Sequence, residues 1–113
     1  MNGCQEHGSN SMVRFAVRTI REHACDGLRA IDVVRQMHCS RRLAELRFRE
    51  MTGLSILGAI RNIRFDKARW LLANTKATVA SIANRCGYTS VPTFCREFRK
   101  ETDVTPEAWR QKA

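Results

Sequence analysis

The second half of the chain repeats the first half at an offset of 50 residues. Four residues of the first copy, Ser40, Phe48, Arg49 and Thr52, recur in the second copy as Ser90, Phe98, Arg99 and Thr102. An apolar pair precedes each serine, Val33 and Val34 in one copy and Ile82 and Ala83 in the other, and the second copy has one extra residue before its serine. A repeat constrains the fold strongly, because both copies must form the same local structure. Each copy is predicted to form a short helix, a tight turn and a serine-capped helix, which together make a helix-turn-helix.

The second helix of such a motif fits the major groove of DNA, and the charge of the chain agrees with that partner. Lys and Arg number 20 against 11 Asp and Glu, which gives a net charge of +9. A chain this basic is expected to bind an anionic partner, most often nucleic acid or an acidic membrane surface. No apolar run reaches the roughly 20 residues that span a bilayer, so we expect no membrane segment and favour double-stranded DNA.

The apolar spacing predicts an all-α protein of seven helices without strands. The predicted helices cover residues 12–24, 29–37, 41–52, 56–74, 79–86, 91–101 and a last helix after Thr105. They are expected to form an N-terminal helix plus a first helix-turn-helix lobe (12–54), a long connector helix (55–74) and a second helix-turn-helix lobe (75–113). Residues 1–11 are polar and contain glycine and serine, so we expect a disordered tag or linker and not a signal peptide.

The helix predicted at residues 41–52 has the features of a recognition helix. Its inward residues are predicted to be Ala44, Phe48 and Met51. Its outward residues are predicted to be Arg41, Arg42, Glu45 and Leu46. Arg42 can bond guanine O6 and N7 in bidentate fashion, Glu45 can accept from cytosine N4, and Leu46 can contact a thymine methyl group. Arg49 lies further along the helix and is better placed to bind a phosphate.

The helix predicted at residues 91–101 has a different outward face. Phe94 and Phe98 point inward, one turn apart. The outward residues are predicted to be Val91, Pro92, Thr93 and Arg96. Arg96 is the best candidate for a base contact, whereas Val91 and Pro92 offer apolar contacts to thymine methyl groups. Because the two copies differ in their outward residues, we expect an asymmetric DNA site that one monomer spans.

The helix starts and the connector bear on how the two copies meet DNA. Ser40 and Ser90 are good N-caps, and the free amides at residues 41–43 and 91–93 can bind phosphate oxygens. A connector of about 20 residues extends roughly 30 Å as a helix, which is close to the ~34 Å of one DNA turn. We therefore expect the two recognition helices to enter successive major grooves, and the small shortfall favours a bent duplex.

The cysteines argue against a disulfide framework and against catalysis. There are five, without paired spacing: Cys4, Cys25, Cys39, Cys86 and Cys95. This usage is typical of a reducing cytoplasm. No C-x-x-C spacing and no Cys/His set resembles a tetrahedral zinc site, so the sequence predicts no metal, no cofactor and no enzyme activity. Cys86 and Cys95 are expected to be small core residues, with contact to the DNA backbone as an alternative for Cys95.

Four motifs of the chain together resemble those of AraC/XylS-type bacterial transcription regulators. They are R-F-x-x-A-x-x-L-L (Arg64–Leu72), I-A-x-x-x-G-Y (Ile82–Tyr88), F-x-x-x-F (Phe94–Phe98) and T-P-x-x-W-R (Thr105–Arg110). The resemblance covers about residues 13–111, and the pattern within residues 20–50 is similar to the DNA-binding end of xylose-operon regulators. It implies two helix-turn-helix lobes joined by a long helix, direct-repeat-like promoter sites and activation through contacts with RNA polymerase.

The resemblance also implies which residues bind DNA and where this chain departs from its relatives. The implied base-reading positions are the outward residues of the two recognition helices given above. His38 stands where the first turn commonly has glycine, and Ala44 stands where leucine is common. Both departures suggest a looser first lobe, although histidine tolerates a left-handed backbone better than most residues. The usual effector domain is absent, so any sugar sensing would belong to a missing N-terminal part.

The alternative is a helical module that binds RNA or a partner protein without a sequence-specific DNA role. RNA readers usually present stacking aromatic residues on sheets, whereas the phenylalanines of this chain have the spacing of a helical core. The sequence therefore favours a cytoplasmic transcription regulator, here without its effector domain, with promoter DNA and RNA polymerase as its partners.

Overall fold

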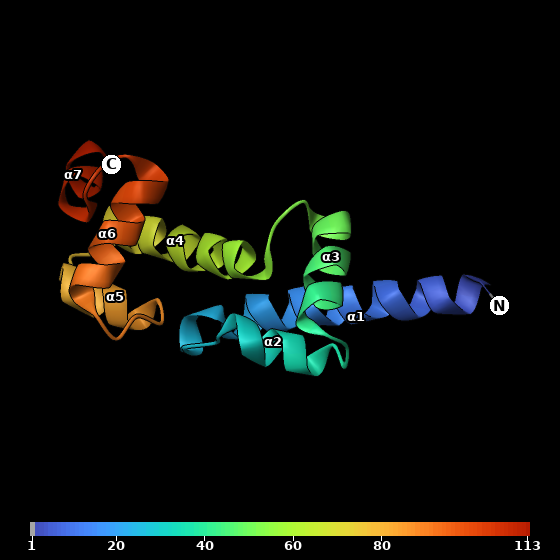
Figure 1. Cartoon of the computed structure of the whole chain (residues 1–113). Helices are drawn as coiled ribbons and strands as arrows, with labels where there is room; N and C mark the ends of the chain where they lie inside the picture. Colours follow the sequence, from blue (N-terminus) through green and yellow to red (C-terminus); the bar gives the residue numbers. More distant parts are fainter. Residues whose placement is uncertain (1) are drawn as a thin grey trace. The chain divides into compact units, whose positions relative to one another are not determined.

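The computed structural model describes residues 2–113, with side chains from residue 10 onward, and it confirms the all-α prediction (Figure 1). The helices are α1 (Asn2–His23), α2 (Ala30–Gln36), α3 (Arg41–Thr52), α4 (Ile56–Asn74), α5 (Val79–Arg85), α6 (Val91–Thr102) and α7 (Pro106–Lys112). A single 3-10 turn, η1 (Ala24–Asp26), follows α1. Residues 2–113 contain no strand. The bounds agree closely with the sequence prediction for every helix except α1.

Helix α1 differs from the prediction at its N-terminal end. The sequence analysis placed a disordered tag or linker at residues 1–11, whereas the structure places residues 2–11 in the helix. A helix that is already nucleated gains one hydrogen bond for each further residue, and no proline lies in this segment to stop it. The polar composition of residues 1–11 therefore led to a prediction of α1 that was too short at its N-terminal end.

The chain divides into two compact units, and the division falls inside α4. The first unit comprises the chain up to Ala24 and Leu28–Arg61, and the second unit comprises Cys25–Gly27 and Asn62–Ala113. The sequence analysis assigned residues 55–74 to a separate connector. The packing of α4 explains the difference, because Phe65 and Leu72 belong to the core of the second unit. Ile56, by contrast, is buried at the beginning of the helix.

Helices α1, α2 and α3 pack against one another in the first unit. Its buried residues include Val13, Ala16, Ile20, Val33, Val34, Met37, Ala44 and Phe48. The prediction that Met51 is buried is wrong, because 45% of this residue is exposed. Met51 lies with Val13 and Val17 in the lining of an open hollow between α1 and the end of α3, where its side chain is only partly covered.

Aromatic rings fill the core of the second unit. Phe94 and Phe98 are fully buried, which confirms their predicted inward placement, and their ring centroids lie 5.8 Å apart. Phe65 from α4 contacts both rings, at 6.4 Å and 5.9 Å. Trp109 from α7 meets Phe98 edge-on at 6.1 Å. Ring pairs at these separations contribute about 0.5–1.5 kcal/mol each beyond their burial.

Arg110 fixes α7 to the end of α4 in this unit. Its guanidinium donates to the carbonyl oxygens of Leu72, Thr75 and Ala77, at 3.1 Å, 3.3 Å and 2.6 Å. Carbonyl groups at the C-terminal end of a helix and just beyond it lack intrahelical donors. The T-P-x-x-W-R motif therefore contributes both a core ring and the group that satisfies these carbonyls.

Candidate nucleic-acid interface

The turn between α2 and α3 contains a residue with left-handed backbone. His38 has a φ of 54°, in the region that favours glycine. The equivalent residue between α5 and α6 is Gly87, with a φ of 93°. The structure therefore confirms that His38 occupies the glycine position of the turn. Only the second turn has the residue type that adopts this conformation without strain.

Replacing His38 with glycine is expected to stabilise the first unit by about 0.5–1 kcal/mol. A left-handed residue with a Cβ atom costs roughly 1–2 kcal/mol, and the greater freedom of glycine in the unfolded chain offsets part of the gain. The His38 side chain is exposed, so its loss removes no core contact. Thermal unfolding followed by far-UV circular dichroism measures the effect. Gly87→Ala is the matched change in the second unit and should be destabilising; an unchanged midpoint for His38→Gly would mean that the first turn is unstrained.

Helix α3 begins and packs as a recognition helix does. The Ser40 Oγ accepts a hydrogen bond from the Leu43 N–H at 3.2 Å, which confirms Ser40 as the N-cap. Ala44 and Phe48 are fully buried and seat the helix on its unit. Its exposed residues include four of the predicted DNA contacts, Arg41, Arg42, Leu46 and Arg49. All four side chains are exposed to solvent.

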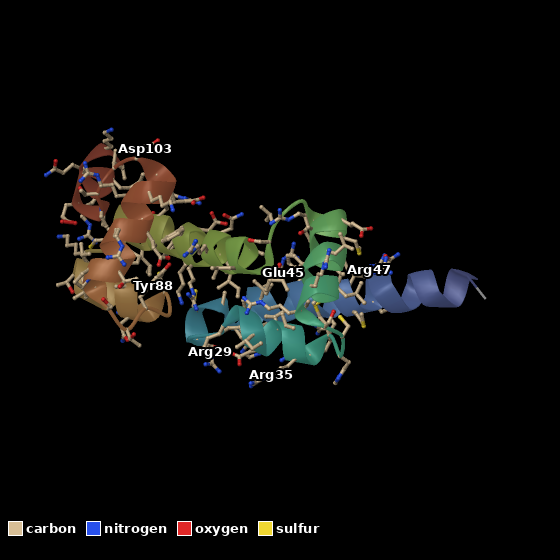
Figure 2. The ribbon with its side chains drawn as sticks, in the orientation of Figure 1. Arg29, Arg35, Glu45, Arg47, Tyr88 and Asp103 are labelled. Carbon is tan, nitrogen blue, oxygen red and sulfur yellow. The ribbon has the colours of Figure 1, made fainter. Side chains whose placement is uncertain are left out.

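Two further exposed residues of α3 were not among the predicted contacts. Leu43 and Arg47 are both exposed and lie one turn apart on the helix, and Figure 2 labels Arg47. Their spacing from Leu46 places them beside the predicted face. The helical periodicity of the sequence could have predicted that both residues are exposed. They add one apolar and one charged side chain to the exposed face of α3.

Glu45, which Figure 2 labels, is less exposed than the other predicted DNA contacts on α3. It is half-buried, and its Oε1 accepts a hydrogen bond from the Ile56 N–H at 3.0 Å. Sequence analysis assigned this carboxylate to cytosine N4. The structure instead gives one of its oxygens a partner at the first residue of α4. Helical spacing within α3 could not reveal a contact with the next helix.

The second helix-turn-helix, α5 and α6, repeats the frame of the first with other exposed side chains. The Ser90 Oγ accepts from the Thr93 N–H at 3.3 Å, so Ser90 is the N-cap of α6, as predicted. Three predicted contacts, Val91, Pro92 and Arg96, are exposed. The fourth, Thr93, is half-buried, so its side chain is less accessible than theirs.

A polar contact that the sequence did not reveal supports α6. The Tyr88 hydroxyl donates to Glu97 Oε1 at 2.9 Å, and the Arg64 guanidinium lies 5.2 Å from the centre of the Tyr88 ring. Burial, followed by the hydrogen bond to Glu97, raises the pKa of Tyr88 well above its ordinary value. The phenol therefore remains a donor, and it ties the turn before α6 to the middle of that helix.

The repeat also extends to the C-terminal ends of α3 and α6. The Thr52 and Thr102 hydroxyls each donate to the phenylalanine carbonyl four residues earlier, at 2.8 Å in both units. The next residues, Gly53 and Asp103, are both left-handed, with φ of 75° and 67°. Helices α3 and α6 therefore start and stop through the same contacts, although their exposed residues differ.

The charges on the exposed faces are available to an anionic partner. The ion pairs of the described side chains include Arg18 with Glu22, Arg29 with Asp32, and Asp66 with Arg69. Among residues 10–113, no ion pair engages the four arginines of the predicted DNA contacts, Arg41, Arg42, Arg49 and Arg96. Exposed guanidinium groups of this kind bind phosphate oxygens or base edges.

The described residues offer no competing metal site. Within them, no three His, Cys, Asp or Glu side chains gather where a metal ion would bind. Cys86 is in the core of the second unit, as predicted, and burial raises the pKa of its thiol to about 12. Cys95 is half-buried and packs against that core. Cys4 lies outside the described side chains. In the described part of the chain, no helix is long and apolar enough to cross a membrane.

Two helix-turn-helix units, each with a serine-capped second helix, are typical of a DNA-binding class of protein. Residues 33–112 match the family described as "Helix-turn-helix domain". The chain belongs to this family, which is the AraC/XylS type of DNA-binding transcription regulator. The resemblance found in the four sequence motifs is therefore confirmed.

Individual relatives agree with the family. The chain is 37% identical over 95 residues to the xylose operon regulatory protein of Escherichia coli, an alignment that covers 84% of this chain and 24% of that protein. Among solved structures, it is similar to the C-terminal domain of AraT, a response regulator from Geobacillus stearothermophilus (TM-score 0.84, 27% identity, 90% of this chain, 85% of that one). It is also similar to the DNA-binding domain of AdpA in complex with a target DNA (TM-score 0.81, 27% identity, 88% and 90%).

Proposed function

We propose that the chain binds double-stranded DNA sequence-specifically, with α3 and α6 in two successive major grooves of one site. The observation that supports this is the repeated frame. Both helices have a serine cap, two buried residues one turn apart and a left-handed residue at the end, yet they expose different side chains. Two recognition helices with a common frame and different faces suit one asymmetric site read by one monomer.

The exposed side chains divide into those suited to bases and those suited to phosphates. We assign base contacts to Arg42 and Leu46 on α3, and to Arg96 with Val91 and Pro92 on α6. Their exposure supports the assignment. Arg49 is assigned to a phosphate, together with the amides that follow Ser40 and Ser90. Arg41, which the sequence analysis placed among the base-reading residues, is the first residue of α3 and adjoins these amides, so we propose a phosphate contact for it instead. Thr93 is assigned a weaker DNA contact than these residues, since its side chain is half-buried.

We further propose that the chain is the DNA-binding part of a cytoplasmic regulator, an activator that contacts RNA polymerase and controls sugar catabolism. Its relatives support this reading, since one of them is named for the xylose operon. The chain spans only 24% of that relative, so effector sensing would belong to sequence outside this chain. Transcription in vitro from a promoter that contains the selected site, with and without the chain, tests activation directly.

Selection of bound sequences from a random double-stranded DNA pool tests the DNA-binding proposal. We expect two different half-sites to be enriched, with centres about 10–10.5 base pairs apart. The expected result is a non-palindromic site bound by one chain, because the two recognition helices expose different residues. Enrichment of a single half-site, or of an inverted repeat, would contradict the use of both helices by one monomer.

A further inference from the structure

Helix α4 receives its first hydrogen bond from the recognition helix of the same unit. The Ser55 Oγ accepts from the Gly58 N–H at 2.9 Å, and Glu45 Oε1 accepts from the Ile56 N–H at 3.0 Å. The first turn of α4 contains no acidic residue of its own. The Glu45 carboxylate therefore supplies both an acceptor and the negative charge that stabilises a helix N-terminus.

The second unit starts its last helix without such a contact. At the positions equivalent to Glu45 and Ile56 in the repeat, it has Cys95 and Pro106. Proline has no N–H, so the first residue of α7 needs no acceptor. Glu107 provides an acidic residue within the first turn of α7 itself. The acceptor from the recognition helix is thus present in the unit where the N–H is present, and absent in the unit where proline removes it.

We propose that Glu45 is a positioning residue of the first recognition helix, which holds α3 against the start of α4 and does not read a base. This role rests on the proposed DNA binding, since it is the orientation of a groove-bound helix that Glu45 would fix. Base choice at the first half-site then falls to Arg42 and Leu46.

A double-mutant cycle with Ile56 tests the contact in the whole chain. Glu45→Ala is expected to lower the melting midpoint of the first unit by about 4–8 °C, through the loss of a charge-assisted hydrogen bond. In an Ile56→Pro background the same substitution should have a much smaller effect, because no N–H remains and only the interaction of the charge with the helix start is lost. Circular dichroism measures both midpoints. If Ile56→Pro does not fold, Glu45→Gln decides, since its amide oxygen still accepts while the negative charge is lost. Its midpoint should lie above that of Glu45→Ala and below that of the parent chain.

Cys95→Ala is the matched control at the equivalent position of the second unit. We expect it to leave the start of α7 unaffected, because Pro106 has no N–H to lose a partner. A drop in midpoint as large as that of Glu45→Ala would attribute the effect to general packing of the helix flank and would overturn the specific contact.

Selection from a random DNA pool separates positioning from base reading. Glu45→Ala should enrich the same bases as the parent chain and bind the selected site several-fold more weakly, and Glu45→Gln should restore that affinity. A changed base at the first half-site in either variant, or an unchanged midpoint for Glu45→Ala, would overturn the positioning role and leave DNA binding intact. A parent chain that enriches no sequence would instead overturn the proposed function itself.

Discussion

Replacing Phe98 with alanine is expected to unfold the second unit, with a loss of about 3–5 kcal/mol in its free energy of unfolding. Phe98 is fully buried, and its ring meets those of Phe65, Phe94 and Trp109 at 5.9 Å, 5.8 Å and 6.1 Å. Truncation removes these three ring contacts and leaves a cavity among side chains from three helices. Small domains are stable by only about 5–15 kcal/mol, so a loss of this size removes much of the total.

The positions of the fluorescent residues allow this loss to be assigned to one unit. Both tryptophans, Trp70 and Trp109, lie in the second unit, so tryptophan fluorescence reports unfolding there. In a denaturant titration, Phe98→Ala should shift the fluorescence transition to much lower concentration or abolish it. Phe48→Ala is the matched core change in the first unit and should affect that transition far less. A parent-like fluorescence transition for Phe98→Ala would contradict its place in the core.

A surface control completes this comparison. Phe15 is 57% exposed, so Phe15→Ala removes a ring of the same size without opening a core cavity. We expect it to change the free energy of unfolding by no more than about 0.5 kcal/mol, as for other surface substitutions. Phe15 and Phe48 both lie in the first unit, so the difference between Phe48→Ala and Phe15→Ala, followed by circular dichroism, measures burial, and the loss of an aromatic ring as such cancels.

The repeat made most of the helix bounds predictable from the sequence because helix starts and stops are local. A serine hydroxyl reaches an amide three residues later, as Ser40 and Ser90 do. A left-handed residue closes the end, as Gly53 does. Buried positions one turn apart followed from the period of the helix. None of these features depends on how separate helices pack, so one sequence was enough to place them.

The contacts that join one helix to another were not predictable in this way. Arg110 reaches carbonyl oxygens more than 30 residues earlier, and Tyr88 finds its acceptor on the following helix. Glu45 is a third example, because its hydrogen bond with Ile56 joins α3 to α4 and could not be found from its place on α3 alone. The prediction that Met51 is buried was wrong for a related reason, since the exposure of its side chain depends on how far α1 covers the end of α3.

Replacing Arg42 with alanine is expected to weaken binding to the selected DNA site by about 1–3 kcal/mol and to relax base choice at one position of the first half-site. Arg42 is exposed in the first turn of α3, and no ion pair among residues 10–113 engages its guanidinium. It can therefore bond guanine O6 and N7 with two parallel donors. Titration of the selected site and of random DNA at one fixed salt concentration measures the specific and nonspecific parts separately.

Two further arginine variants show which property of Arg42 matters. Arg42→Lys keeps the charge but loses the planar pair of donors, so it should retain nonspecific affinity and lose base choice. Arg49→Ala removes an exposed charge assigned to a phosphate, so it should weaken all sequences alike and reduce the slope of log K against log salt by about 1. Because both residues lie on α3 and neither is buried, a shared loss of fold cannot explain opposite patterns. If Arg42→Ala leaves the affinities for selected and random DNA unchanged, base reading by the first recognition helix does not depend on this residue and the assignment fails.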